Sequence, residues 1–265
     1  MTRKLAVVTG GSRGMGAAMV KRFTTEGWDV VFTYVTDEAA ANAVIAEIAA
    51  AEDTAPERTA TGRDTTGVGA ARAVQLDLGD PDSIISFWQE LDLDGRVPDA
   101  VVNNAAVTGP KTTLAELDLE VLQAVTAVNW TGTVLFTREA VRRMARSAGG
   151  AGGAIVNMSS TAVRLGSPDQ WIHYAALKGA IDVLTVGLAR EVGPEGIRVN
   201  AVSPGYTLTD PGREAEIMAR FEAMRHEVPL DRIGENEEVA AGVYWLCSDE
   251  SSYVTGTVLP IAGGR

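Results

Sequence analysis

The chain has 265 residues, of which 46% are hydrophobic and 22% are charged, and its formal net charge is −12. This size suffices for the core of one α/β domain spanning 1–265, whereas the acidic balance argues against a nucleic-acid surface, which needs clustered lysine and arginine. One cysteine and two histidines leave almost no ligands for a His/Cys metal site, so we expect no metal.

The sequence carries no sign of a membrane segment. No apolar run approaches the roughly 20 residues that span a bilayer, and the first residues enter a strand-like run without a signal-peptide pattern. The single Cys247 lies in an apolar helical pattern, which predicts buried packing and agrees with a reducing compartment. We therefore expect a soluble, cytoplasmic protein with no membrane partner.

Short apolar runs alternate with helix-period stretches along almost the whole chain. The strand candidates are 4–10, 29–35, 72–77, 98–105, 153–159, 197–203 and 256–263. The helical patterns lie at about 14–26, 37–51, 81–91, 114–146, 171–192 and 236–247. Strands rich in Val and Ile and separated by helices predict a doubly wound α/β fold, with a mostly parallel seven-stranded sheet and helices on both faces.

Two segments interrupt this alternation. Residues 52–71 are polar and rich in Thr, Gly and Ala, and they make a long connection that we interpret as a surface insertion. Residues 206–235 follow a strand end and contain a helical pattern of their own. At the carboxyl edge of a parallel sheet, such a segment is well placed to cover a substrate.

The first strand candidate runs directly into a glycine-rich turn. Gly10, Gly14 and Gly16 allow a tight turn and a close backbone approach, and the helix that follows presents unpaired N–H groups to a pyrophosphate. A strand, this turn, a helix and a second strand in that order predict a Rossmann-type nucleotide site.

Through its TGxxxGxG spacing the sequence resembles the short-chain dehydrogenase/reductase family, and the resemblance covers nearly the whole chain. The matching motifs are TGGSRGMG (9–16), LDL (76–78), NNAA (103–106), Asn129 in AVNWTG, IVNMSS (155–160), YAALK (174–178) and NAVSPGYTLT (200–209). The resemblance implies an enzyme that transfers a hydride between a nicotinamide cofactor and a carbonyl or alcohol. Among family members, the chain looks like 3-oxoacyl-carrier-protein reductases and sugar dehydrogenases.

The resemblance also implies a set of cofactor-binding residues. Asp77 would meet the adenine edge, Asn103 the adenosine side and Thr209 the nicotinamide carboxamide. The full set is Thr9, Gly10, Ser12, Arg13, Gly14, Met15, Gly16, Tyr34, Asp77, Leu78, Asn103, Ala105, Pro204, Gly205, Thr207 and Thr209.

The end of the second strand bears on the choice of nicotinamide. NAD-specific sites usually place an acid there, where it binds the ribose hydroxyls. By alignment this position is Tyr34, so no carboxylate repels a 2′-phosphate, and Arg13 is available to pair with it. NADP(H) is therefore favoured over NAD(H), although Asp37 would reverse the preference if the register were shifted by three residues.

Tyr174 and Lys178 are four residues apart in a helical pattern, so their side chains project from the same face. A free tyrosine titrates near 10, and a nearby ammonium stabilises the phenolate. We expect Lys178 to lower the pKa of Tyr174, which would then act as the general acid or base.

The resemblance adds two residues to this pair. Ser160 follows a strand end and would hold the substrate oxygen, with Ser159 as the competing choice. Asn129 would accompany a helix irregularity and support a proton relay through Lys178. Its alternative interpretation is a polar helix residue that caps its own turn.

The chain departs from the family pattern near the expected substrate. Ala106 stands where NNAG has glycine, the interval from Ser160 to Tyr174 is one residue longer than usual, and Val163 replaces a frequent glycine. These changes predict an altered substrate wall in Val163–Trp171.

Four side chains near the expected active site are candidates for lining the pocket or for packing. We expect Trp171 to line the pocket or to pack under it, and His173 to be structural rather than a second base. Tyr206 and Leu208 are candidates for substrate contact and equally compatible with packing.

The leading hypothesis is an NADP(H)-dependent carbonyl reductase or alcohol dehydrogenase acting on a small molecule. A carrier-protein substrate would need a basic patch, for which Arg142, Arg143 and Arg146 are the candidates. A non-catalytic NADP(H) sensor is the alternative from another class. By analogy with the family we expect a homotetramer or homodimer that pairs helices 114–146 and 171–192.

Overall fold

The computed structural model describes residues 3–54, 67–208 and 214–265, and its core is a sheet of seven parallel strands. The strands are β1 (Leu5–Val8), β2 (Asp29–Tyr34), β3 (Ala71–Gln75), β4 (Ala100–Asn103), β5 (Gly153–Met158), β6 (Ile197–Pro204) and β7 (Val258–Ile261). They lie in the order β3-β2-β1-β4-β5-β6-β7. In register, Val7 of β1 pairs with Val31 on one side and Val101 on the other.

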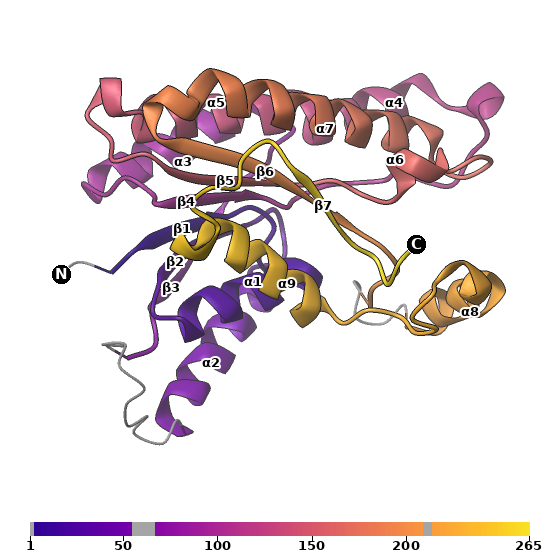
Figure 1. Ribbon diagram of the computed structural model, residues 1–265, viewed down its shortest axis with the longest axis horizontal. Coiled ribbons are helices and arrows are strands. Elements are labelled where there is room, and N and C mark those ends of the chain that lie inside the picture. The colour runs from indigo at the N-terminus through magenta and orange to yellow at the C-terminus, as the bar shows by residue number, and fades with distance from the viewer. Residues whose placement is uncertain (1–2, 55–66, 209–213) are drawn as a thin grey trace.

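Helices cover both faces of the sheet (Figure 1). The longer ones are α1 (Gly14–Thr25), α2 (Glu38–Thr54), α3 (Pro81–Leu93), α4 (Leu119–Thr126), α5 (Thr133–Met144), α7 (Ile172–Val192), α8 (Glu214–Met224) and α9 (Asn236–Cys247). One apolar cluster packs α1, α2 and α9 on one face, and a second packs α3, α5 and α7 on the other. The predicted doubly wound α/β fold is confirmed.

The helical pattern predicted at 114–146 is not one helix. A short 3₁₀ turn (Leu114–Glu116) precedes α4, and a π-helical segment (Ala127–Gly132) joins α4 to α5. This segment requires a glycine at its end, because a Cβ on Gly132 would lie 2.0 Å from the Leu78 carbonyl oxygen. Apolar periodicity continues through a π-helical turn and predicted one helix. The helix irregularity that the family resemblance implied at Asn129 is present in this segment.

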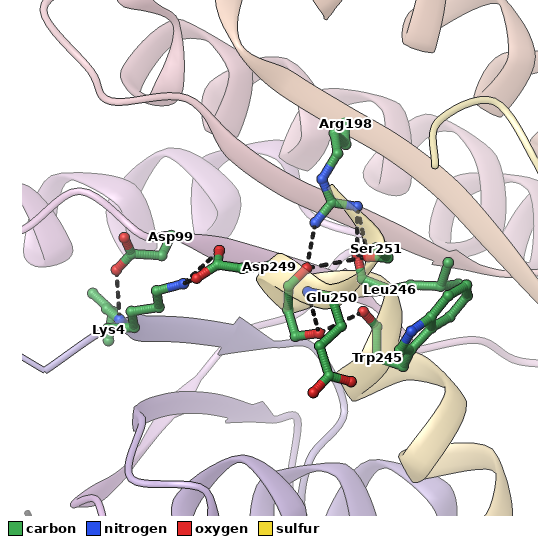
Figure 2. A network of polar contacts seen from close by, with 10 residues as sticks. Lys4, Asp99, Arg198, Trp245, Leu246, Asp249, Glu250 and Ser251 are labelled. Atoms are coloured by element: carbon green, nitrogen blue, oxygen red, sulfur yellow. Dashed lines mark hydrogen bonds and ion pairs between the residues drawn. The ribbon is translucent and has the colours of Figure 1, made fainter. Parts of the chain in front are cut away.

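Polar contacts fasten α9 to the sheet (Figure 2). Arg198 on β6 donates to the carbonyl oxygens of Leu246 at 2.8 Å and Ser248 at 3.0 Å, at the helix C-terminus where backbone carbonyl groups lack helical partners. Nearby, Lys4 donates to both carboxylate oxygens of Asp249 at 2.9 Å. These bonds fix the end of α9 against β6 and the start of β1.

The two predicted interruptions are partly described. The first, 52–71, contains the end of α2 and the start of β3, while 55–66 lie outside the described residues. In the second, 206–235, α8 stands apart from the sheet beyond its carboxyl edge (Figure 1). It is followed by a 3₁₀ turn, Arg225–Glu227.

One stretch, Ile172–Glu195, is long and apolar enough to pass a simple test for a membrane span, contrary to the expectation that none would. It consists mainly of α7. A third of its test window is buried within the chain, and the helix packs against the sheet through residues such as Ile181 and Ala189. Packing against the sheet therefore accounts for part of its apolar composition, while other apolar residues such as Val183 are exposed.

Candidate active site

A cavity of about 790 Å³ opens at the carboxyl ends of the strands. Its lining comes from the glycine-rich turn, the loops after β4, β5 and β6, and the start of α7. The lining residues include Arg13, Met15, Ala106, Val107, Ser160, Trp171, Tyr174, Pro204, Gly205, Thr207, Glu227 and Arg265. The cavity thus joins the predicted nucleotide loop to the predicted catalytic tyrosine.

The glycine-rich turn is packed too tightly for side chains. Gly10 has φ of +67° and Gly14 has φ of +53°, values that favour glycine. A Cβ on Gly16 would lie 2.0 Å from the Gly10 carbonyl oxygen. Ser12 and Arg13 lie in the same turn just before α1, where unpaired helix N–H groups are available to a phosphate. This cradle fits a dinucleotide.

Asn104, which the sequence analysis did not single out, fastens this turn to the loop after β4. Its amide donates to the carbonyl oxygens of Thr9 and Gly10 at 2.9 and 3.0 Å. The Thr9 hydroxyl in turn accepts from the backbone N–H groups of Asn104 and Ala105. Thr9 and Ala105 therefore help to fix the nucleotide loop. The NNAA motif was the sequence feature from which the role of Asn104 could have been predicted.

The residues around the end of β2 bear on the choice of nicotinamide. Tyr34 is the last residue of β2, and Arg13 is exposed in the glycine-rich turn. Asp37 accepts a hydrogen bond from the Ala40 N–H at 2.9 Å, so its carboxylate caps the start of α2. This capping role explains an acid at position 37 without any ribose contact.

The Asn103 side chain is engaged inside the protein. Asn103 is 5% exposed, and its amide donates to Thr137 at 2.8 Å and to Asn157 at 2.7 Å. These bonds keep the side chain in a buried polar network between β4, β5 and α5. The amide nitrogen of Asn103 is therefore committed to this network, and the contact of this residue with the adenosine stays a prediction.

The remaining predicted cofactor residues lie at strand ends. Asp77 follows β3 and accepts from the Gly79 N–H at 2.7 Å, while Leu78 is buried beneath it. Pro204 ends β6, and the Gly205 N–H donates to the Ile261 carbonyl oxygen at 3.0 Å. The Thr207 hydroxyl lies 3.9 Å from the sulfur of Met15. Thr209 lies outside the described residues.

Tyr174 and Lys178 lie on the first two turns of α7, and Lys178 is 4% exposed. Burial raises the pKa of Tyr174 to about 12, and its hydrogen bond with Ser160 opposes part of that shift. Burial also lowers the pKa of Lys178 to about 8, against the opposing influence of the Asp182 carboxylate.

The pKa of Tyr174 thus moves in the direction opposite to the expected one, because burial dominates the shift, and the influence of Lys178 on the phenol stays a prediction. The Lys178 ammonium lies 5.6 Å from the centre of the tyrosine ring and donates to the Met158 carbonyl oxygen at 2.5 Å. Desolvation of the phenol outweighs whatever this charge contributes. In this state the phenol keeps its proton at neutral pH and is able to donate it.

The two candidate serines after β5 have different surroundings. Ser160 accepts from the Ala162 N–H at 3.1 Å and is the hydrogen-bond partner of Tyr174. The Ser159 hydroxyl is buried and lies beside Asp182. Burial raises the pKa of that carboxyl, and a side-chain hydrogen bond with Ser159 opposes the shift. The geometry favours Ser160 as the partner of Tyr174.

Asn129 lies in the π-helical segment and is 1% exposed. Its side chain accepts from the Val107 N–H at 2.9 Å and donates to the Val107 carbonyl oxygen at 2.7 Å. The side chain therefore holds the loop after β4 rather than capping its own turn.

Arg265 and Glu227 were missed by sequence reasoning. Arg265 is paired with Glu227 at 2.7 Å, and its guanidinium lies 4.3 Å from the centre of the Tyr206 ring. The three residues come from separate segments, so no local pattern could have connected them.

Comparison with known proteins agrees with this geometry. A family model described as enoyl-(acyl carrier protein) reductase matches residues 10–265. The chain is 40% identical to the uncharacterized oxidoreductase YgfF of Escherichia coli over 98% of this chain and 99% of that one. The chain belongs to the short-chain dehydrogenase/reductase family. As a member of this family it is an oxidoreductase with a nicotinamide cofactor site.

One further relative and one solved structure are similar to this chain over nearly its whole length. A 3-oxoacyl-[acyl-carrier-protein] reductase of Synechocystis is 34% identical, covering 100% of this chain and 97% of its own. The crystal structure of a short-chain dehydrogenase from Burkholderia cenocepacia in complex with NADP is 33% identical, with a TM-score of 0.83 over 98% of this chain and 97% of that one. The Rossmann-type fold of the family is thus confirmed.

The candidate basic patch is partly paired with acids. Arg143 is paired with Asp92 at 2.7 Å and with Glu139 at 3.0 Å, and Arg142 is paired with Glu139 at 2.8 Å. These acids hold part of the positive charge that a carrier protein would need.

Proposed function

We propose that the protein is an NADP(H)-dependent reductase of small-molecule ketones, working in reverse as an alcohol dehydrogenase. The observation that carries this proposal is the meeting of the glycine-rich turn, Ser160 and Tyr174 in one cavity. When bound, the reduced cofactor supplies the hydride. Tyr174 donates its proton to the carbonyl oxygen, which Ser160 orients, and Asn129 and Lys178 support the return of a proton to the phenol.

The preference for NADP(H) is supported by the charges around the end of β2. Tyr34 carries no charge that repels a phosphate, the Asp37 carboxylate is engaged at the start of α2, and Arg13 is exposed beside the nucleotide loop. A related structure contains NADP. Residues Thr9 to Gly16, Asp77, Pro204, Gly205, Thr207 and Thr209 complete the proposed cofactor site.

A steady-state assay of NADPH and NADH consumption tests both points. The substrates are a panel of ketones, β-keto esters, acyl thioesters and sugars. We expect turnover with NADPH, and we expect Tyr174→Phe to lower kcat by about 10²- to 10⁴-fold, the usual contribution of a general acid. NADPH binding without turnover of any carbonyl would favour the sensor instead, and equal use of NADH would contradict the cofactor preference.

A 3-oxoacyl-carrier-protein reductase remains the second candidate, because one relative bears that name. The pairing of Arg142 and Arg143 with acids weighs against it. An acyl group on a whole carrier protein and the same group on a short thiol distinguish the two. A KM much lower for the protein-bound form would support the carrier-protein substrate. A sugar dehydrogenase would be revealed by the same panel.

We also propose that the protein is a cytoplasmic homodimer or homotetramer. The support lies in α7, whose outer side carries apolar side chains such as Val183, 74% exposed, and Ile172, 39% exposed. Light scattering coupled to size exclusion tests this assembly. A monomer at micromolar concentration would refute it, and Val183→Glu is expected to dissociate it.

A further inference from the structure

The loop that follows β4 forms one wall of the cavity, through residues 106–109. Side chains hold the backbone of three consecutive residues in this loop. The Asn129 side chain forms hydrogen bonds with both the N–H and the carbonyl oxygen of Val107. The carbonyl oxygens of the next two residues, Thr108 and Gly109, are both bound from the start of α7. The wall is therefore tied to two helical segments at once.

His173 and Trp171 make the contacts from α7. Nε2 of His173 lies 2.9 Å from the Thr108 carbonyl oxygen, and because that oxygen only accepts, Nε2 carries the hydrogen. The indole Nε1 of Trp171 donates to the Gly109 carbonyl oxygen at 3.0 Å. Between the same two segments, the Thr112 N–H donates to the Gln170 carbonyl oxygen at 2.9 Å.

The imidazole is in an unfavourable place for a polar ring. His173 is 6% exposed, and its Nδ1 is buried with no hydrogen-bond partner among the described residues. Burying a polar atom unpaired is costly, and an apolar side chain would fill the same space without that cost. Compared with an apolar side chain, the imidazole therefore adds one favourable interaction at this position, the hydrogen bond to the Thr108 carbonyl oxygen.

The loop also has little freedom on its other side. Gly109 has φ of +69°, and a Cβ there would lie 2.9 Å from Cγ1 of Val121 on α4. The wall is thus confined between α4 and the start of α7. If the contacts from His173 and Trp171 were lost, this confinement would remain, and the loop would loosen rather than unfold.

We propose that His173 and Trp171 are positioning residues that set the distance between the cavity wall at 106–109 and the phenol of Tyr174. They precede Tyr174 by one and three residues, so the wall and the catalytic acid are carried by the same turn of α7. A wall that is held less firmly would fit the ketone less closely, which weakens its binding. The two side chains thereby determine which carbonyl compounds fit, an inference that rests on the proposed reductase function.

Three variants test this role. His173→Leu removes the ring donor, His173→Gln keeps an N–H group at a similar reach, and Trp171→Phe removes the indole donor while keeping an aromatic wall. Each is assayed with NADPH against one compact and one bulky ketone from the panel. Hydrogen exchange of the peptide 104–113 and the unfolding temperature are measured alongside.

We expect His173→Leu and Trp171→Phe to raise the KM for the ketone about three- to tenfold, unequally for the two substrates, as for the loss of one hydrogen bond. The KM for NADPH and kcat should change less than about twofold, and His173→Gln should restore most of the wild-type behaviour. Exchange in 104–113 should be faster in the first two variants only.

Two results would overturn the proposal. One is an equal loss in His173→Gln and His173→Leu with a lowered unfolding temperature and an unchanged substrate ratio, which indicates a purely structural role. The other is unchanged exchange in 104–113. If the wild-type protein reduces no carbonyl at all, the proposed function fails, and the exchange measurement alone decides whether these residues hold the loop.

Discussion

The substitution Gly16→Ala is a severe test of the nucleotide loop. The added Cβ would lie 2.0 Å from the Gly10 carbonyl oxygen and 2.7 Å from the Asn104 amide nitrogen, whereas real Cβ contacts essentially never fall below 3.0 Å. Helix α1 and the turn must therefore separate by about 1 Å. Overpacking of this kind costs about 1–3 kcal/mol.

The same displacement moves the N–H groups at the start of α1 away from the pyrophosphate. Loss of about 1.4 kcal/mol of binding corresponds to a tenfold weaker complex. We therefore expect the Kd for NADPH to rise at least about tenfold in Gly16→Ala. Titration of tryptophan fluorescence with NADPH measures this, and thermal unfolding reports the accompanying loss of stability.

Gly187→Ala is the matched control. Gly187 lies inside α7, and a Cβ there meets nothing within 4 Å. Inside a helix alanine is favoured over glycine by about 0.5–1 kcal/mol, because glycine loses more conformational freedom on folding. NADPH affinity should not change. Wild-type affinity in Gly16→Ala would refute the assignment of this turn as the pyrophosphate cradle.

Three other residues give simpler predictions. Asp37→Ala should lower the free energy of unfolding by about 1 kcal/mol, because it removes the cap on the Ala40 N–H. A stronger kinetic preference of this variant for NADPH over NADH would contradict a purely capping role. Lys178 has a pKa of about 8 when folded against 10.5 as its ordinary value. The unfolded chain therefore binds more protons between these pH values, and stability to urea should rise with pH across that window, but less so in Lys178→Met. Glu227→Gln should weaken the hold on Arg265 and raise the KM for the ketone about two- to fivefold, with the KM for NADPH unchanged in the same assay. If the kinetics were unchanged, this ion pair would not shape the cavity.

Much of the fold was predictable because the residues of each strand and helix match the place of that element in the core. Strands β1, β4 and β5 are buried on both faces, so their apolar residues run on without alternation, and helices lie between them. The segment around Asn129 is different. A π-helical turn adds one residue to a helix without disturbing its apolar character, so sequence periodicity predicted one continuous helix.

Side-chain direction and desolvation were harder to predict. The strand pattern puts Asn103 at the end of β4 but does not say that Thr137 and Asn157 will draw its amide inward. Spacing likewise pairs Tyr174 with Lys178 but carries no information on how deeply each is buried. The result is a pKa for Tyr174 that moves in the direction opposite to the expected one.

The raised pKa of Tyr174 has a chemical meaning for the proposed reaction. A phenol with a pKa of about 12 is fully protonated at neutral pH, so the group is ready to donate to a carbonyl oxygen without first taking up a proton. Reversal would require removal of that proton, which is costly in this buried site. Lys178 is mostly charged below pH 8 and lies on the same helix face. With Trp171 and His173 at its start, α7 carries the proton donor, its neighbouring charge and the residues that hold the substrate wall. Any shift of this helix would therefore change all three together.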